Sequence, residues 1–68
     1  MKTIAELNAY VGGLSEQDKS SLRQLLTMLP TAKLSDLLHV ARGTKDKTKI
    51  KFAEACLELS RLKEAGVL

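Results

Sequence analysis

The sequence predicts an all-α protein, a compact bundle of three to four short helices in which the last helix is the longest. Apolar residues, mostly leucines, recur at intervals of three and four, which is the spacing of one helical face. Glycine and proline fall at only a few points and divide the 68-residue chain into four segments. No alternating run of β-branched and aromatic residues is long enough for a strand. The length allows a single helical domain over residues 1–68.

The first two segments have recognisable starts and stops. We expect a helix over about residues 3–11, with Thr3 as its N-cap. Gly12-Gly13 should end it, because glycine readily adopts the left-handed conformation of a helix stop. The second helix should begin after Ser15, another good N-cap, and Pro30 prevents it from continuing. This second segment has the clearest amphipathic pattern in the chain.

The third and fourth segments are predicted at about residues 31–42 and 46–65. Either Thr31 or Ser35 could cap the third helix, and the sequence does not decide between them. Gly43 is the expected residue after its last turn. The joint between the second and third helices is only one or two residues long, so the chain must change direction sharply there.

The last helix is apolar on two nearly opposite sides, and such helices are normally buried on two sides. Either the short helices wrap it completely, or one side binds a partner protein or a second copy of the chain as a homodimer. The sequence does not show which side faces inward. The candidate partner-binding residues are Phe52, Leu59 and Leu62 on one side, and Ile50 and Leu57 on the other.

A basic segment joins the last two helices. Five of the ten residues from 42 to 51 are positively charged and only Asp46 is negative. Such a segment could bind an anion or nucleic acid through phosphate contacts, in a loosely helix-turn-helix-like arrangement, or it could be a solvated loop that aids solubility. Lysines without Asn or Gln beside them contact phosphates rather than base edges. The candidate residues are Arg42, Lys45, Lys47, Lys49 and Lys51.

Residues that carry chemistry are scarce. A single cysteine, Cys56, cannot form a disulfide within the chain, and with the single histidine, His39, it cannot form a Cys/His zinc site. We expect Cys56 in the core and His39 at the surface. No glycine-rich phosphate loop or catalytic constellation is present. We therefore expect no enzymatic activity, no cofactor, no metal and no small-molecule substrate.

Location and role follow from the same pattern. No apolar run approaches the roughly 20 residues of a membrane span, and no signal-peptide pattern follows Met1. Together with the lone cysteine, this predicts a cytoplasmic protein without a membrane partner. The leading hypothesis is a small helical interaction module, regulatory or inhibitory, that binds a macromolecular partner through the last helix and adjoining surface. The alternative is a nucleic-acid-binding protein that uses residues 42–51.

Overall fold

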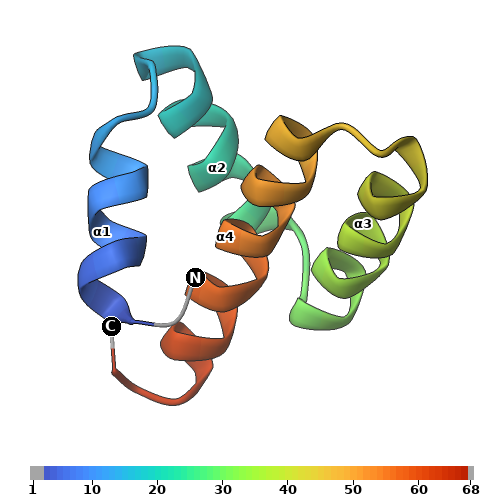
Figure 1. Cartoon of the computed structure of the whole chain (residues 1–68). Coiled ribbons are helices and arrows are strands. Elements are labelled where there is room, and N and C mark those ends of the chain that lie inside the picture. Colours follow the sequence, from blue (N-terminus) through green and yellow to red (C-terminus); the bar gives the residue numbers. More distant parts are fainter. Residues whose placement is uncertain (1–2, 68) are drawn as a thin grey trace.

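The computed structural model describes residues 3–67, and over this range it contains four helices and no strand (Figure 1). The all-α prediction is confirmed, as is the prediction that the last helix, with 18 residues, is the longest. The helices are α1 Ile4–Gly12, α2 Glu16–Met28, α3 Thr31–Thr44 and α4 Lys47–Glu64.

Helix α4 lies in the middle of the bundle, with α1 on one side, α3 on the other and α2 behind (Figure 1). It packs most extensively against α3 and also against α2. The molecule measures 31 × 25 × 23 Å. A central helix of this kind needs apolar residues on more than one side, which is the pattern that the sequence of α4 has.

The core is aliphatic and comes mainly from α3 and α4. Leu34 of α3 and Cys56 of α4 are 0% exposed, and Leu22 of α2 packs against the same cluster. Cys56 is thus a core residue as predicted, and His39 is exposed as predicted. The other buried members of this cluster are Leu38, Ala41, Ala53 and Leu57.

The helix starts predicted from local sequence are confirmed for α1 and α2. Thr3 Oγ1 accepts the backbone N–H of Glu6 at 3.1 Å, and Ser15 Oγ accepts that of Asp18 at 3.1 Å. The prediction that a left-handed glycine at Gly12-Gly13 ends α1 was wrong. Gly13 has a φ of −85° and is right-handed, and its N–H continues the helical hydrogen bonding to Ala9 and Tyr10.

The prediction for α3 was right about its start, at Thr31, but wrong about its capping residue and its end. Neither Thr31 nor Ser35 caps the helix: Pro30 occupies the N-cap position, with no side-chain hydrogen bond there. The helix also runs through Gly43, and the left-handed residue is Lys45, with a φ of 58°. Thr44 stabilises this corner, because its hydroxyl donates to the carbonyl of Ala41 at 2.6 Å and accepts the N–H of Asp46 at 3.3 Å.

Side-chain hydrogen bonds lie at both ends of α4, and those towards its end join it to α3. At its start, a carboxylate oxygen of Asp46 accepts the N–H groups of Thr48 and Lys49, at 3.0 and 3.4 Å. Towards its end, the Thr31 hydroxyl lies 2.6 Å from that of the buried Ser60. The same Thr31 hydroxyl donates to Glu64, which joins the first turn of α3 to the last turn of α4.

Candidate functional site

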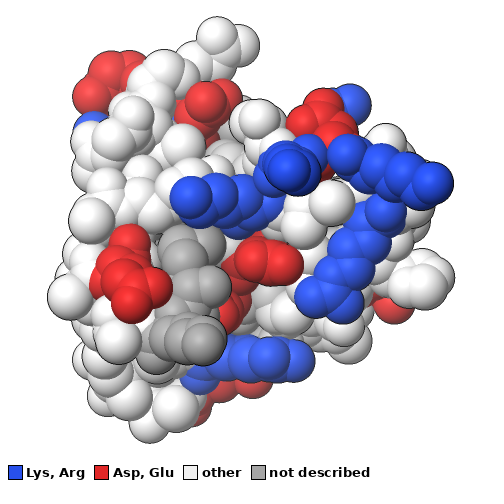
Figure 2. Space-filling view, in the orientation of Figure 1, with Lys and Arg blue, Asp and Glu red and all other residues white. Residues whose placement is uncertain are grey.

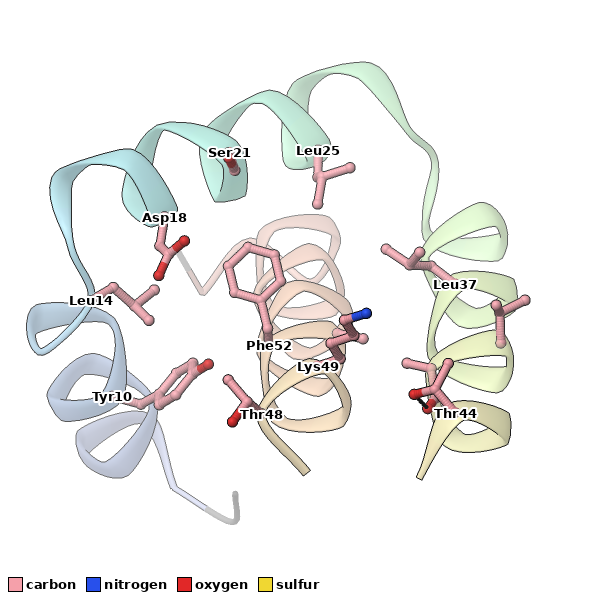
Figure 3. A pocket seen from close by; sticks show the side chains of 13 residues that line it. Tyr10, Leu14, Asp18, Ser21, Leu25, Leu37, Thr44, Thr48, Lys49 and Phe52 are labelled. Atoms are coloured by element: carbon pink, nitrogen blue, oxygen red, sulfur yellow. Dashed lines mark hydrogen bonds between the residues drawn. The ribbon is translucent and has the colours of Figure 1, made fainter. Parts of the chain in front are cut away.

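An open cleft of about 560 Å³ is lined by residues from all four helices (Figure 3). Its volume lies in the range of binding pockets, which are mostly apolar with a few polar groups. Val40 of α3 forms part of this lining and is 65% exposed, so apolar surface here is open to solvent. The apolar lining is mainly Leu14, Leu25, Leu37, Val40, Phe52 and Ala53.

Polar groups reach the cleft from all four helices, including the hydroxyls of Ser21 on α2 and Thr44 on α3. Asp18 comes from α2, whereas Thr48 and Lys49 come from the start of α4 (Figure 3). Tyr10 of α1 also lines the cleft, and burial together with nearby Cys56 and Asp18 raises its pKa above 10.0. Its hydroxyl is therefore protonated at neutral pH and can donate a hydrogen bond to a ligand.

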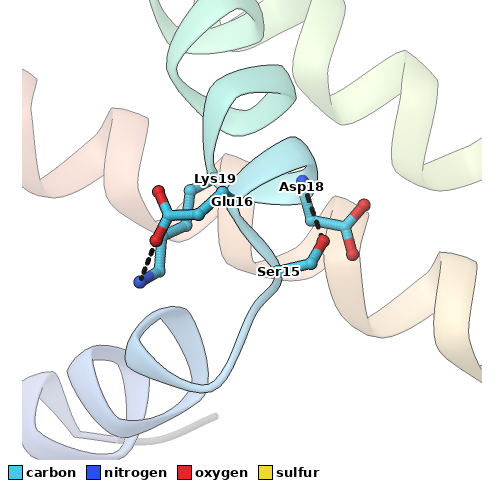
Figure 4. Close-up of polar contacts among 4 residues, drawn as sticks. All are labelled: Ser15, Glu16, Asp18 and Lys19. Atoms are coloured by element: carbon cyan, nitrogen blue, oxygen red, sulfur yellow. Dashed lines mark hydrogen bonds and ion pairs between the residues drawn. The ribbon is translucent and has the colours of Figure 1, made fainter.

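The N-terminal turn of α2 directs its two carboxylates differently (Figure 4). Glu16 forms an ion pair with Lys19 at 3.5 Å, outside the cleft lining. Asp18 is held by the bond from its N–H to Ser15, while its carboxylate has no ion pair within residues 3–67. The Asp18 carboxylate therefore contributes a negative charge to the α2 wall.

The apolar residues that the sequence assigned to a partner lie mostly against the chain's own core. Leu57 is 5% exposed and belongs to the core cluster. Ile50, Phe52 and Leu59 are half-buried and pack against that cluster, and Leu62 is half-buried. Both apolar sides of α4 are thus largely covered by the other helices, and among these five residues only Phe52 lines the cleft.

The five basic residues surround the corner between α3 and α4, where Figure 2 shows Lys and Arg side chains gathered. They have different neighbours. The Arg42 guanidinium lies 3.7 Å from the Glu54 carboxylate. The Lys51 ammonium lies 5.4 Å from the centre of the Tyr10 ring, and Lys49 lines the cleft. Lys45 and Lys47 are exposed without an ion pair in the described part of the chain.

The sequence did not predict the cleft, because each helical segment that contributes a wall has an ordinary amphipathic pattern when it is taken alone. One signal was available in α4. Lys49 precedes Phe52 by three residues and Cys56 by seven, so it continues the inward-facing stripe towards the helix start. A lysine in a stripe of otherwise apolar or small residues indicates that the stripe is not covered at that end.

Residues 3–67 contain neither a cluster of metal ligands nor a membrane-spanning helix. No group of three or more His, Cys, Asp or Glu side chains there could hold a metal ion. None of the four helices is both long and apolar enough to cross a membrane. Compared with known proteins, the chain matches no family model, no curated protein and no solved structure.

Proposed function

We propose that this protein is a small cytoplasmic interaction module that regulates or inhibits a partner protein by binding an apolar segment of it. The observation that carries this proposal is the cleft, which remains open although the four helices cover the core. Aromatic side chains in a concave setting, such as Tyr10 and Phe52, are typical anchors of protein interfaces. The partner-binding surface is then centred on the cleft and includes Phe52 from the predicted set.

The same lining supports the expectation that the protein is not an enzyme. The ionisable groups in the cleft are Tyr10, Asp18 and Lys49. Burial raises the pKa of Tyr10, so its phenol stays protonated at neutral pH, and Asp18 and Lys49 come from different walls. Such a set favours orienting a bound segment over transferring protons.

A matched pair of exposed apolar residues tests the proposal. Val40 lines the cleft and is 65% exposed, whereas Met28 at the end of α2 is 75% exposed and lies outside the lining. Affinity-tagged wild type, Val40→Asp and Met28→Asp proteins are expressed in the native host, and the proteins that copurify in stoichiometric amount are identified. We expect Val40→Asp to lose the partner and Met28→Asp to retain it, with unchanged circular dichroism for both. Equal retention or equal loss would contradict the proposal.

The basic corner favours nucleic-acid binding as a second candidate function. Lys45 and Lys47 are exposed and have no ion pair within residues 3–67. Contacts of about three lysines with phosphates would give a slope near −3 when log affinity is plotted against log salt concentration. Fluorescence anisotropy with a random DNA duplex across a salt series measures this slope. Loss of binding in Lys45→Glu/Lys47→Glu, but not in a Lys33→Glu/Lys63→Glu control, would support this function.

A further inference from the structure

We infer that the segment bound in the cleft is an acidic amphipathic helix of a partner protein. Its apolar side chains would enter the cleft, and its carboxylates would face Lys49 and the lysines at the α3–α4 corner. The inference rests on the proposed function, and it adds the conformation and the charge of the segment that is bound.

The shape of the cleft favours a helix. Its walls are the side chains of four helices, and an apolar groove between helices typically accepts an amphipathic helix through anchors at positions i, i+3, i+4 and i+7. Addition of a β-strand needs a free sheet edge, and residues 3–67 contain no strand. The exposed Val40 and half-buried Phe52 and Leu37 offer adjacent contacts for such anchors.

The charges around the cleft favour an acidic partner. Lys49 belongs to the lining and has no ion pair within residues 3–67. The exposed Lys45 and Lys47 lie at the same corner outside the lining, and they also have no ion pair in that range. Asp46 does not offset them fully, because it is the one negative residue among the five positive residues of 42–51. Complementary charge at such a rim selects partners and speeds their association.

Asp18 gives the bound helix a direction. Among residues 3–67 it is the only carboxylate of the lining, and it lies on the α2 wall, away from the α4 wall that carries Lys49 (Figure 3). A helix with acidic residues at one end would therefore place that end over Lys49. Its neutral or basic end would lie towards Asp18 and the protonated hydroxyl of Tyr10.

The experiment is selection from a displayed library of amphipathic helices about 18 residues, or five turns, long. The apolar anchor positions are restricted to Leu, Ile, Phe and Met, and the flanking positions to Glu, Gln and Lys. Selections use wild type, Lys49→Glu, Val40→Asp and the control Lys33→Glu, whose exposed side chain lies on α3 outside the lining. Enriched peptides are then measured singly by fluorescence anisotropy at low and high salt.

We expect wild type and Lys33→Glu to enrich Glu at one end of the peptide. Lys49→Glu should weaken these peptides about threefold to tenfold, as expected for an exposed ion pair turned into a repulsion, and should enrich Lys instead. Val40→Asp should enrich no peptide.

Four other results would overturn the inference and can be told apart. Peptides with Gln flanks that bind as tightly as those with Glu flanks, and lose binding in Val40→Asp, would leave the cleft as a docking site but remove its preference for acidic segments. The absence of any enriched peptide would overturn the inference of a helix and leave the proposed function standing. Peptides that bind Val40→Asp as well as wild type would remove the proposed function too. A dimer in sedimentation equilibrium that Val40→Asp dissociates would assign the cleft to a second copy of the chain.

Discussion

The buried thiol of Cys56 gives a sharp test of the core. Cys56 is 0% exposed, and burial raises the pKa of its thiol from 9.0 to about 11. At pH 8 this leaves about a hundredfold less thiolate, the form that reacts with disulfide reagents. Such a reagent must also wait until the core opens. At about 5 kcal/mol of stability, a typical value for a small domain, opening alone slows the reaction more than a thousandfold.

The assay is the rate of reaction with an aromatic disulfide reagent at pH 8, in native buffer and in concentrated guanidinium. We expect the native reaction to be slower by at least a thousandfold. The variant Cys56→Ser/Met28→Cys moves the thiol to a position that is 75% exposed, and it should react at nearly the unfolded rate. A native rate for Cys56 within about tenfold of the unfolded rate would refute the packing of α4 in the core.

The same thiol makes stability depend on pH in the alkaline range. Because the pKa of Cys56 is higher in the folded state, the thiol's contribution is complete below about pH 9 and is lost as the pH rises from 9 to about 11. Full loss would be about 3 kcal/mol, of which about 2 kcal/mol is gone at pH 10.5. Urea unfolding at pH 8 and pH 10.5 measures this loss. Comparison with Cys56→Ala separates it from the raised pKa of Tyr10, which acts in the same direction.

Three further substitutions test the packing and the hydrogen bonds of the bundle by urea unfolding. Leu34→Ala removes a side chain that is 0% exposed and should cost about 2–5 kcal/mol, whereas Val40→Ala, at a position 65% exposed, should cost less than about 0.5 kcal/mol. Asp46→Ala removes the N-cap of α4 and should cost about 1 kcal/mol, most of which Asp46→Asn should restore. Thr31→Val leaves the buried Ser60 hydroxyl without its 2.6 Å partner and should cost about 1–3 kcal/mol. The double variant with Ser60→Ala should then cost less than the sum of the two single changes, and full additivity would show that the two hydroxyls do not interact.

Local sequence predicted the features of the fold that local interactions determine. Thr3 and Ser15 cap their helices because each hydroxyl needs only a backbone N–H three residues away. The periodic leucines specify amphipathic helices for a similar reason, since the face is set by the spacing of the residues. Nothing outside the segment is needed for these predictions, and the structure agrees with them.

The limits of α3 depend on contacts that the sequence does not display. A helix would be expected to stop before Gly43, yet α3 runs on to Thr44, whose hydroxyl bonds the carbonyl of the buried Ala41. Lys45 then adopts the left-handed conformation that glycine favours. At the other end, Thr31 bonds Ser60 and Glu64, both about thirty residues away in sequence, instead of capping its own helix.

The two-sided pattern of α4 correctly indicated a helix covered on two sides, but a pattern cannot say what covers it. In the structure the other three helices largely do so, which is why Leu57 lies in the core. The argument for a partner then no longer rests on the apolar residues of α4 as a set. It rests on the cleft, where apolar surface stays open to solvent and which is lined by residues from all four helices.

The other helices do not cover the inward-facing side of α4 at its start, and the sequence there gives a physical reason. The inward-facing stripe of α4 continues from Phe52 to Lys49, where an ammonium group replaces an apolar side chain. Burial of that ammonium group would carry a large desolvation cost, so the neighbouring helices cannot close over it. A leucine at this position could fill the space between the walls and gain the free energy of burial. Lys49 is exposed where it lines the cleft, and the selectivity inferred for the cleft rests on its positive charge.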